Sequence, residues 1–231
     1  MGRPAYWPWL LLSPALLLLG FFVFWPVIYL VGLSLTSGSF TRAGVQWVGL
    51  RHYSRLVTDP DFWQALGNSL GYTLATVIPS LGLGLGLALL LNRRHPGAGV
   101  VRTLYFLPSV TSLAAAGLAF RWLFQTEGPV NGALGLLGFA PFSWLADPWG
   151  ARAVLVLLSI WVQVGFNWVV LLAGLQAIPH HLYEAAGLDG ATSWQQFWWI
   201  TLPNLRPALV FAAVTTTLFS LRSFEPVYVV T

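Results

Sequence analysis

Side chains that could do chemistry are few in this chain of 231 residues, and their spacing predicts no catalytic site. The four histidines form no H-E-x-x-H pair, no serine lies in a G-x-S-x-G sequence, and no pair of carboxylates lies within the long apolar runs. The chain also lacks cysteine and lysine, so thiolate chemistry, cysteine metal sites and the lysine of a P-loop are excluded. We therefore predict that the chain is not an enzyme and holds no cofactor of its own.

One weak metal-site pattern occurs near the middle of the second half. His181 and Glu184 are three residues apart, so on a helix they would share a face and could hold a metal together. The favoured interpretation is a solvated helix start beside a membrane. No metal site is predicted.

Polar side chains inside apolar runs are the remaining candidates for function. Ser159, Gln163 and Asn167 are spaced by four and fall on one helical face. Polar groups at membrane depth must find partners in the bundle interior or in a wet cavity. These three residues could therefore line a solute path, or each could simply bond to a neighbouring helix. The polar group Thr215, Thr216, Thr217 and Ser220 has the same two interpretations and favours packing more.

The elements that carry these residues are membrane spans. The chain is 57% hydrophobic and 8% charged with a mean hydropathy of +0.72, far from the roughly 25% charge of soluble domains. We predict an all-α, polytopic transmembrane helix bundle over residues 1–231 as a single domain. The five predicted spans are residues 10–35, 68–91, 103–124, 153–175 and 205–221. Net charge is +4, and its scattered arginines predict no nucleic-acid binding.

Details within the spans predict how they pack. Ser69, Thr73, Thr76 and Ser80 share one helical face, which is expected to point into the bundle. Gly82 and Gly86 form a G-x-x-x-G sequence, which permits close helix packing. Pro79 and Pro108 predict kinks, because proline removes a backbone donor.

The segment from Pro179 to Pro207 is a polar interruption between two apolar runs and predicts helix, turn, helix. Pro179 suits the first helical residue and Gly187 a helix stop, while Asp189-Gly190 is a turn dipeptide. Ser193 and Gln196 match a capping box, so a second short helix is expected to start there and to run until Pro203.

This segment resembles the EAA loop of binding-protein-dependent ABC importer permeases. The matching positions are Glu184, Ala185, Ala186, Gly187, Asp189, Gly190, Ala191, Phe197, Ile200, Leu202 and Pro203. The resemblance implies a cytoplasmic coupling loop that docks into a cleft on a separate ATP-hydrolysing subunit. An ordinary loop between two spans is the alternative.

A second and more diffuse resemblance, to sugar-importer permeases of the maltose and glycerol-phosphate type, is carried by Gly49-Leu50, Tyr53, Leu56, Asp59-Pro60, Phe62-Trp63 and Asn68. Together the resemblances imply a multi-pass permease of a bacterial-type cytoplasmic (inner) membrane that forms a path for a solute, of which sugar is expected. They further imply ATP-binding subunits that hold ATP and Mg, a second related permease subunit and an extracytoplasmic solute-binding protein. An ion-coupled secondary transporter and a non-transporting membrane scaffold are the alternatives.

Orientation and completeness are further expectations. The arginine-dense turn at 92–102 and the EAA resemblance predict that the amino terminus, this turn and residues 176–204 lie inside, and that residues 36–61 and 125–150 lie outside. In the resembled family a sixth span follows the point where this chain stops, so the chain is expected to be truncated at its carboxyl end.

Overall fold

The computed structural model describes residues 6–39, 42–92 and 98–222. The chain divides between Gly67 and Asn68 into two compact units. The prediction of one domain over residues 1–231 stays a prediction. The arginine-dense part of the turn at 92–102, with Arg93, Arg94 and His95, and the segment after Arg222 lie outside the described residues.

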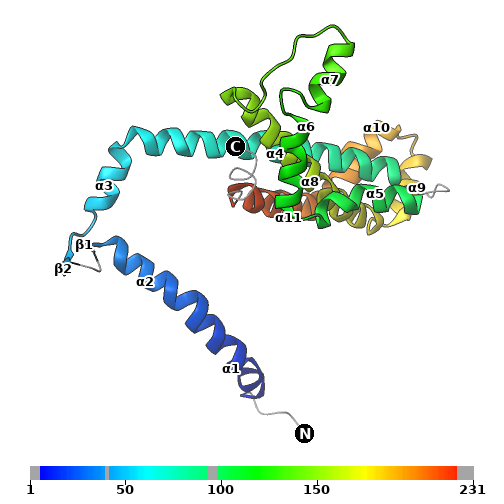
Figure 1. Ribbon diagram of the computed structural model, residues 1–231. Coiled ribbons are helices and arrows are strands. Elements are labelled where there is room, and N and C mark those ends of the chain that lie inside the picture. The colour runs from blue at the N-terminus through cyan, green and yellow to red at the C-terminus, as the bar shows by residue number, and fades with distance from the viewer. Residues whose placement is uncertain (1–5, 40–41, 93–97, 223–231) are drawn as a thin grey trace. The chain divides into compact units, whose positions relative to one another are not determined.

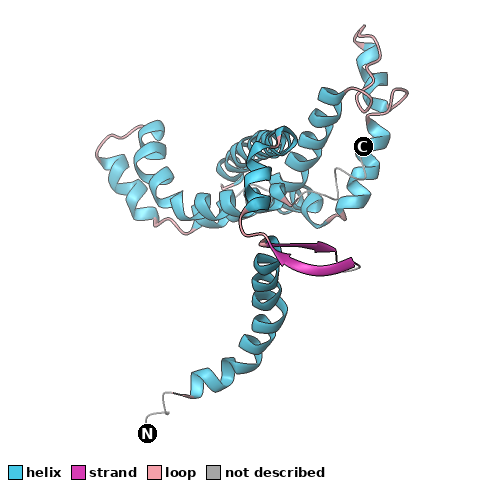
Figure 2. Cartoon of the chain, turned by 90° about the vertical axis from the view of Figure 1, so that its left-hand side faces the viewer, coloured by secondary structure: helices cyan, strands magenta, loops and turns pink. Residues whose placement is uncertain are grey.

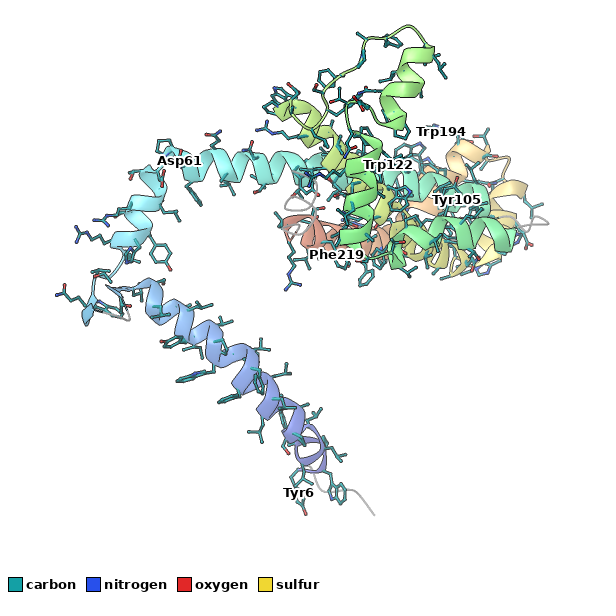
Figure 3. The ribbon with its side chains drawn as sticks, viewed as in Figure 1. Tyr6, Asp61, Tyr105, Trp122, Trp194 and Phe219 are labelled. Carbon is teal, nitrogen blue, oxygen red and sulfur yellow. The ribbon has the colours of Figure 1, made fainter. Side chains whose placement is uncertain are left out.

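The first unit opens with one long apolar helix, which matches the predicted run 10–35. It consists of α1 (Trp7–Leu19), the π-helical turn η1 (Gly20–Phe24) and α2 (Trp25–Ser34), and together these 28 residues are long and apolar enough to cross a membrane. Its side chains project outward along its length, and none is buried (Figure 3). The wider turn lies directly before Pro26, where the Trp25 N–H bonds to the Gly20 carbonyl five residues back. A π turn accommodates the carbonyl clash that proline causes in a regular helix.

The connector after this helix is folded. An antiparallel hairpin of β1 (Thr36–Ser39) and β2 (Arg42–Trp47) is followed by α3 (Arg51–Thr58), and Figure 2 shows the two strands in magenta. The Tyr53 hydroxyl bonds to Ser34 Oγ at 2.7 Å, and His52 Nε2 lies 3.1 Å from the Thr36 carbonyl oxygen. These two bonds fix α3 against the end of α2 and the start of the hairpin.

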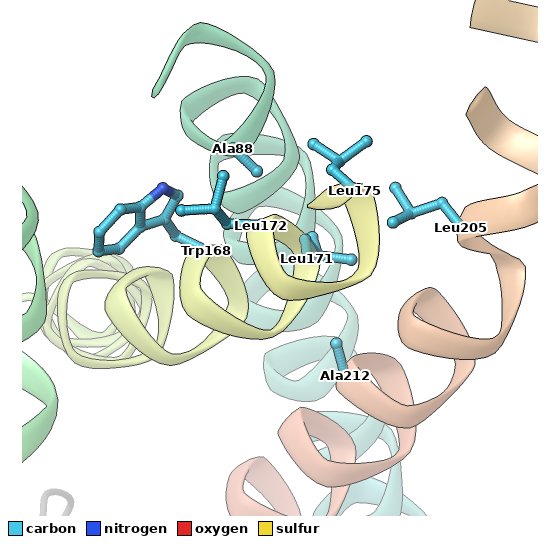
Figure 4. Close-up of a cluster of buried hydrophobic side chains, with 7 residues drawn as sticks. All are labelled: Ala88, Trp168, Leu171, Leu172, Leu175, Leu205 and Ala212. Carbon is cyan, nitrogen blue, oxygen red and sulfur yellow. The ribbon is translucent and has the colours of Figure 1, made fainter. Parts of the chain in front are cut away.

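The second unit is a helical bundle centred on α8 (Pro148–Gln176), against which α5 (Ala98–Val110), α6 (Leu113–Leu123) and α11 (Leu202–Leu221) pack (Figure 1). Two other long helices belong to it: α4 (Pro60–Leu91), whose first turns lie in the first unit, and the helix that ends in α11 (Leu202–Leu221). Figure 4 shows one buried core, where α8 contributes Trp168, Leu171, Leu172 and Leu175, α4 contributes Ala88, and α11 contributes Leu205 and Ala212.

The span predicted over 103–124, with a kink at Pro108, is not one continuous helix. The chain there forms two shorter helices, α5 (Ala98–Val110) and α6 (Leu113–Leu123). Pro108 cannot donate a backbone hydrogen bond, and Ser112 is extended with ψ 128°, so the first helix ends two residues after the proline and a second one begins. Among the described residues, four helices are long and apolar enough to cross a membrane, against five predicted spans.

Close helix packing lies at a different glycine from the predicted pair. A Cβ on Gly84 would lie 2.9 Å from Asn167 Cβ and 3.1 Å from the Trp168 backbone nitrogen, so α4 and α8 meet there. A Cβ on Gly82 or Gly86 would meet nothing within 4 Å in this chain. The central glycine of the three is therefore the one that permits the contact.

Candidate functional site

The segment 179–207 begins with a short helix, as predicted, but one residue later than expected. Pro179 is extended, with ψ 129°, and α9 runs over His180–Leu188. Gly187 lies inside this helix and does not end it. His180 Nδ1, rather than His181, approaches Glu184, at 3.0 Å from its Oε1, and both side chains of this pair are exposed.

The predicted turn at Asp189-Gly190 is confirmed. Gly190 has φ +77°, a conformation that glycine adopts at little cost. The Gly190 N–H bonds to the Gly187 carbonyl at 3.1 Å, and the Ala191 N–H bonds to the Ala186 carbonyl at 2.9 Å. These bonds satisfy carbonyls that the end of α9 would otherwise leave unpaired.

The capping box of the next helix lies one residue before the predicted one. Thr192 is the N-cap, its Oγ1 accepts from the Gln195 N–H, and the Gln195 side chain accepts from the Thr192 N–H at 2.8 Å. Gln196 instead donates from its Nε2 to the Ala191 carbonyl at 3.4 Å. Local hydrogen bonds within the segment thus hold both the turn at Gly190 and the start of the next helix.

The second helix does not stop at Pro203. It continues from α10 (Ser193–Gln196) through the π-helical turn η2 (Phe197–Thr201) into α11, so that residues 193–221 form one membrane-length helix. The Leu202 N–H bonds to the Phe197 carbonyl, which repeats the arrangement that precedes Pro26. The Tyr183 hydroxyl lies 2.9 Å from Thr201 Oγ1 and ties α9 to this turn.

The residues predicted to couple to an ATPase form a mostly open surface. Glu184, Ala185, Gly187, Asp189, Gly190 and Pro203 are exposed, while Ala186, Ala191, Phe197, Ile200 and Leu202 are half-buried. Trp194, which is labelled in Figure 3, and Trp199 are also exposed. A structured turn flanked by exposed apolar rings is chemically suited to docking against another protein.

The second candidate region is a line of polar side chains where α4, α8 and α11 meet, which we call the polar seam. Its members are Tyr72, Thr76 and Ser80 on α4, Ser159, Gln163 and Asn167 on α8, and Thr216 and Ser220 on α11. Asn167 is 0% exposed, donates to Ser80 Oγ at 3.2 Å and accepts from Thr216 Oγ1 at 2.8 Å. One amide therefore bridges three helices.

Four other members of the polar seam form two pairs that join α8 to its neighbours. Ser159 bonds to the Tyr72 hydroxyl, and Gln163 Nε2 donates to Ser220 Oγ at 3.4 Å. Three buried polar atoms in this region have no partner in the described chain: Thr76 Oγ1, Gln163 Oε1 and Trp168 Nε1. The bonds are those that the packing interpretation expects, whereas the open Gln163 and Thr76 oxygens leave hydrogen-bonding capacity for another molecule.

The sequence analysis singled out every member of the polar seam except Tyr72. The spacing of four between Ser159 and Gln163 indicated the α8 face, and Ser80 was assigned to a face pointing into the bundle. Tyr72 lies four residues before Thr76 and eight before Ser80, so the same spacing that indicated the α8 face would have placed it on the inward face of α4. Its hydrogen bond to Ser159 shows that it belongs to the polar seam. Among the described residues no group of three His, Asp or Glu side chains could hold a metal ion.

Comparison with known proteins gives consistent matches over nearly the whole chain. Residues 80–230 match the family described as binding-protein-dependent transport system inner membrane component. The chain is 40% identical over 228 residues to a sulfoquinovosyl glycerol transport system permease protein of Agrobacterium fabrum, covering 96% of this chain and 73% of the relative. It is 36% identical over 224 residues to a lactose transport system permease protein of Rhizobium radiobacter, covering 95% of this chain and 74% of that protein.

A solved structure supports the same relationship. A chain of a bacterial alginate ABC transporter, crystallised in complex with an alginate pentasaccharide-bound periplasmic protein, superposes with a TM-score of 0.76 at 28% identity. The match covers 91% of this chain and 71% of the solved chain. Fold and sequence therefore point to one family.

Proposed function

Because this chain belongs to the binding-protein-dependent transport system inner membrane components, as a permease subunit of the sugar-uptake ABC type, we propose that it forms part of the path of a carbohydrate solute and couples that path to ATP hydrolysis elsewhere. Two regions of the structure would serve these roles. The polar seam would provide the path, and residues 179–207 would provide the coupling.

The observation that carries the solute path is the unpaired Gln163 Oε1 in the polar seam. A carbohydrate presents many hydroxyl groups, which donate and accept hydrogen bonds as serine, threonine and amide side chains do. A buried polar atom without a partner is costly, so a solute hydroxyl that reaches Gln163 would relieve that cost. In this proposal Gln163 and Ser159 exchange their helix partners for the solute, and Asn167 lines the path one turn further along.

Coupling would act through the helix-turn-helix of residues 179–207. The ATP-binding subunits hold ATP and Mg, since this chain has no lysine from which to build a P-loop. Their movement would press on α9 and on the turn at Gly190. The helix of residues 193–221 runs without interruption from this turn to Thr216 and Ser220, so it would carry the displacement into the polar seam.

The full assembly in this proposal lies in the cytoplasmic (inner) membrane and also contains a second, related permease subunit and an extracytoplasmic solute-binding protein. The alginate transporter, crystallised with a pentasaccharide-bound periplasmic protein, supports the solute-binding protein of this assembly by analogy. Copurification with an ATPase separates this function from the two alternatives, an ion-coupled transporter and a non-transporting scaffold.

The test of the path is Gln163→Ala in the assembled transporter, with uptake of radiolabelled lactose, maltose and trehalose measured beside retention of the ATPase. Gln176→Ala is the matched control, because Gln176 lies on the same helix and is exposed. We expect Gln163→Ala to lower uptake several-fold while the ATPase is retained, and Gln176→Ala to leave both unchanged. An equal loss of uptake and assembly in Gln163→Ala would support helix packing instead.

A further inference from the structure

The segment between α6 and α8 has an unusual surface. No charged residue occurs between Glu127 and Asp147, and this stretch includes α7 (Pro129–Leu136) and the turn that follows it. Leu136, Leu137 and Phe139 at this turn are 90%, 74% and 63% exposed. Figure 1 shows α7 standing off from the helices that pack around α8. We call these three side chains the apolar tip.

The backbone that carries the apolar tip is fully organised from within. Asn131 is only 5% exposed, and its amide donates to the carbonyls of Gln125, Thr126 and Phe142 at distances of 2.8 to 3.4 Å. Its Oδ1 accepts from the Phe142 N–H and the Trp144 indole N–H. One buried side chain thus pairs polar groups on both sides of α7 and holds the segment in one shape.

The turn itself also pairs its donors. The N–H groups of Leu137, Gly138 and Phe139 bond to carbonyls of Leu134 and Gly135 at 3.0 to 3.1 Å, with Gly138 at φ +84°. A turn that exposes large apolar side chains while it satisfies its own N–H groups is suited to the membrane interface, where its carbonyl groups can face water while its side chains reach lipid.

The start of α8 carries a second sign of a membrane boundary beside this segment. Trp149 is 74% exposed, and the Arg152 guanidinium lies 4.9 Å from the centre of its ring. Tryptophan and arginine settle at the level of the lipid headgroups. Trp122 on α6 and Trp161 on α8 are two further exposed tryptophans of the helices that this segment joins.

We propose that α7 and its turn form an interfacial anchor. This anchor lies at the surface of the membrane, with the apolar tip in lipid. The bilayer is the occupant that the surface fits, because the tip offers neither charge nor free backbone donors for specific pairing, whereas protein interfaces surround their apolar centre with polar groups. The anchor would hold the ends of α6 and α8 at a fixed membrane depth.

The test uses the absence of native cysteine. Leu137→Cys and Phe139→Cys are each labelled with an environment-sensitive fluorophore in the complete transporter, reconstituted into phosphatidylcholine–phosphatidylglycerol vesicles without its solute-binding protein. Glu127→Cys is the matched control, because Glu127 is exposed at the polar start of the same segment. Quenching is measured with aqueous iodide and with a lipid that carries a nitroxide near its headgroup.

We expect the lipid-borne nitroxide to quench the dye at positions 137 and 139 several-fold more than at 127, and iodide to show the opposite order. Iodide quenching at 137 and 139 equal to that at 127 would place the tip in water and overturn the anchor. Protection from both quenchers would mean that protein covers the tip, which overturns it as well. Neither result depends on which solute the transporter carries.

Discussion

Replacing Gly190 by alanine isolates the contribution of one backbone angle to coupling. Gly190 is exposed and has φ +77°, and an added Cβ would meet nothing within 4 Å. The substitution therefore creates no clash inside the chain, and its whole cost is the left-handed conformation, about 1–2 kcal/mol for a residue with a Cβ. That energy either stays as strain or drives the turn into another shape, which would move α9 relative to α10.

If only the native turn docks, the cost appears as weaker binding of the ATPase. About 1–2 kcal/mol corresponds to roughly 5–30-fold in an equilibrium constant. We expect Gly190→Ala to lower the affinity of the reconstituted permease for its ATPase subunit by that factor and to reduce uptake, while membrane insertion stays normal. Gly190→Asn should lose less, since asparagine tolerates this conformation better. Gly190→Trp should lose more, since its ring would occupy the space in which the ATPase is proposed to dock.

Gly49→Ala is the matched control for this prediction. Gly49 also has a positive φ, +57°, and open space around it, but it lies in the connector before α3. Its substitution brings a similar local strain and should leave ATPase affinity at the wild-type value. Wild-type affinity in Gly190→Ala, or an equal loss in Gly49→Ala, would refute the role of the Gly190 turn in docking.

Two further predictions concern packing and orientation. Gly84→Ala should destabilise the bundle by about 1–3 kcal/mol through overpacking against Asn167, whereas Gly82→Ala should be neutral in this chain. Thermal unfolding of the two variants in detergent measures the difference. Equal melting temperatures would argue against a close contact at Gly84. A cysteine at Arg94 should be protected from a membrane-impermeant reagent in intact cells while one at Glu127 is labelled, and labelling of position 94 from outside would reverse the predicted orientation.

The long apolar runs and the turn residues made most of the fold predictable. A run of membrane length is sufficient to predict a helix, so the elements at residues 10–35 and 153–175 appear near their expected bounds. Asp189-Gly190 predicted the turn because few other dipeptides reach a positive φ at so little cost.

The predictions of helix starts and ends were wrong where the sequence fits two local structures almost equally well. Thr192 with Gln195 and Ser193 with Gln196 both match the capping-box pattern, and the choice depends on the hydrogen bond that Gln196 makes back to Ala191. Pro203 was expected to end a helix, but a π turn before it absorbs the missing donor and the clash.

The contacts between distant segments were the least predictable part. The spacing of Asn167 in the sequence indicated its helical face but not its two hydrogen-bond partners, which lie on helices far away along the chain. Asn131 belongs to no pattern at all. Asn131 matters because the chain folds back and brings the Phe142 N–H and the Trp144 indole N–H to its side chain. Residue spacing does not predict such a long-range contact.

Because the helix from Ser193 to Leu221 is unbroken, the number of residues along it fixes the direction in which each of its side chains points. Each helical residue advances the face by about 100° and the length by about 1.5 Å. Losing one residue between Leu202 and Thr215 would shorten the helix very little, yet it would turn Thr216 away from Asn167 if the docking turn kept its orientation. A change of four residues would alter the length by a whole turn but leave the face only about 40° from its original direction. The number of residues between the turn and Thr216 thus matters chiefly through the angle it sets.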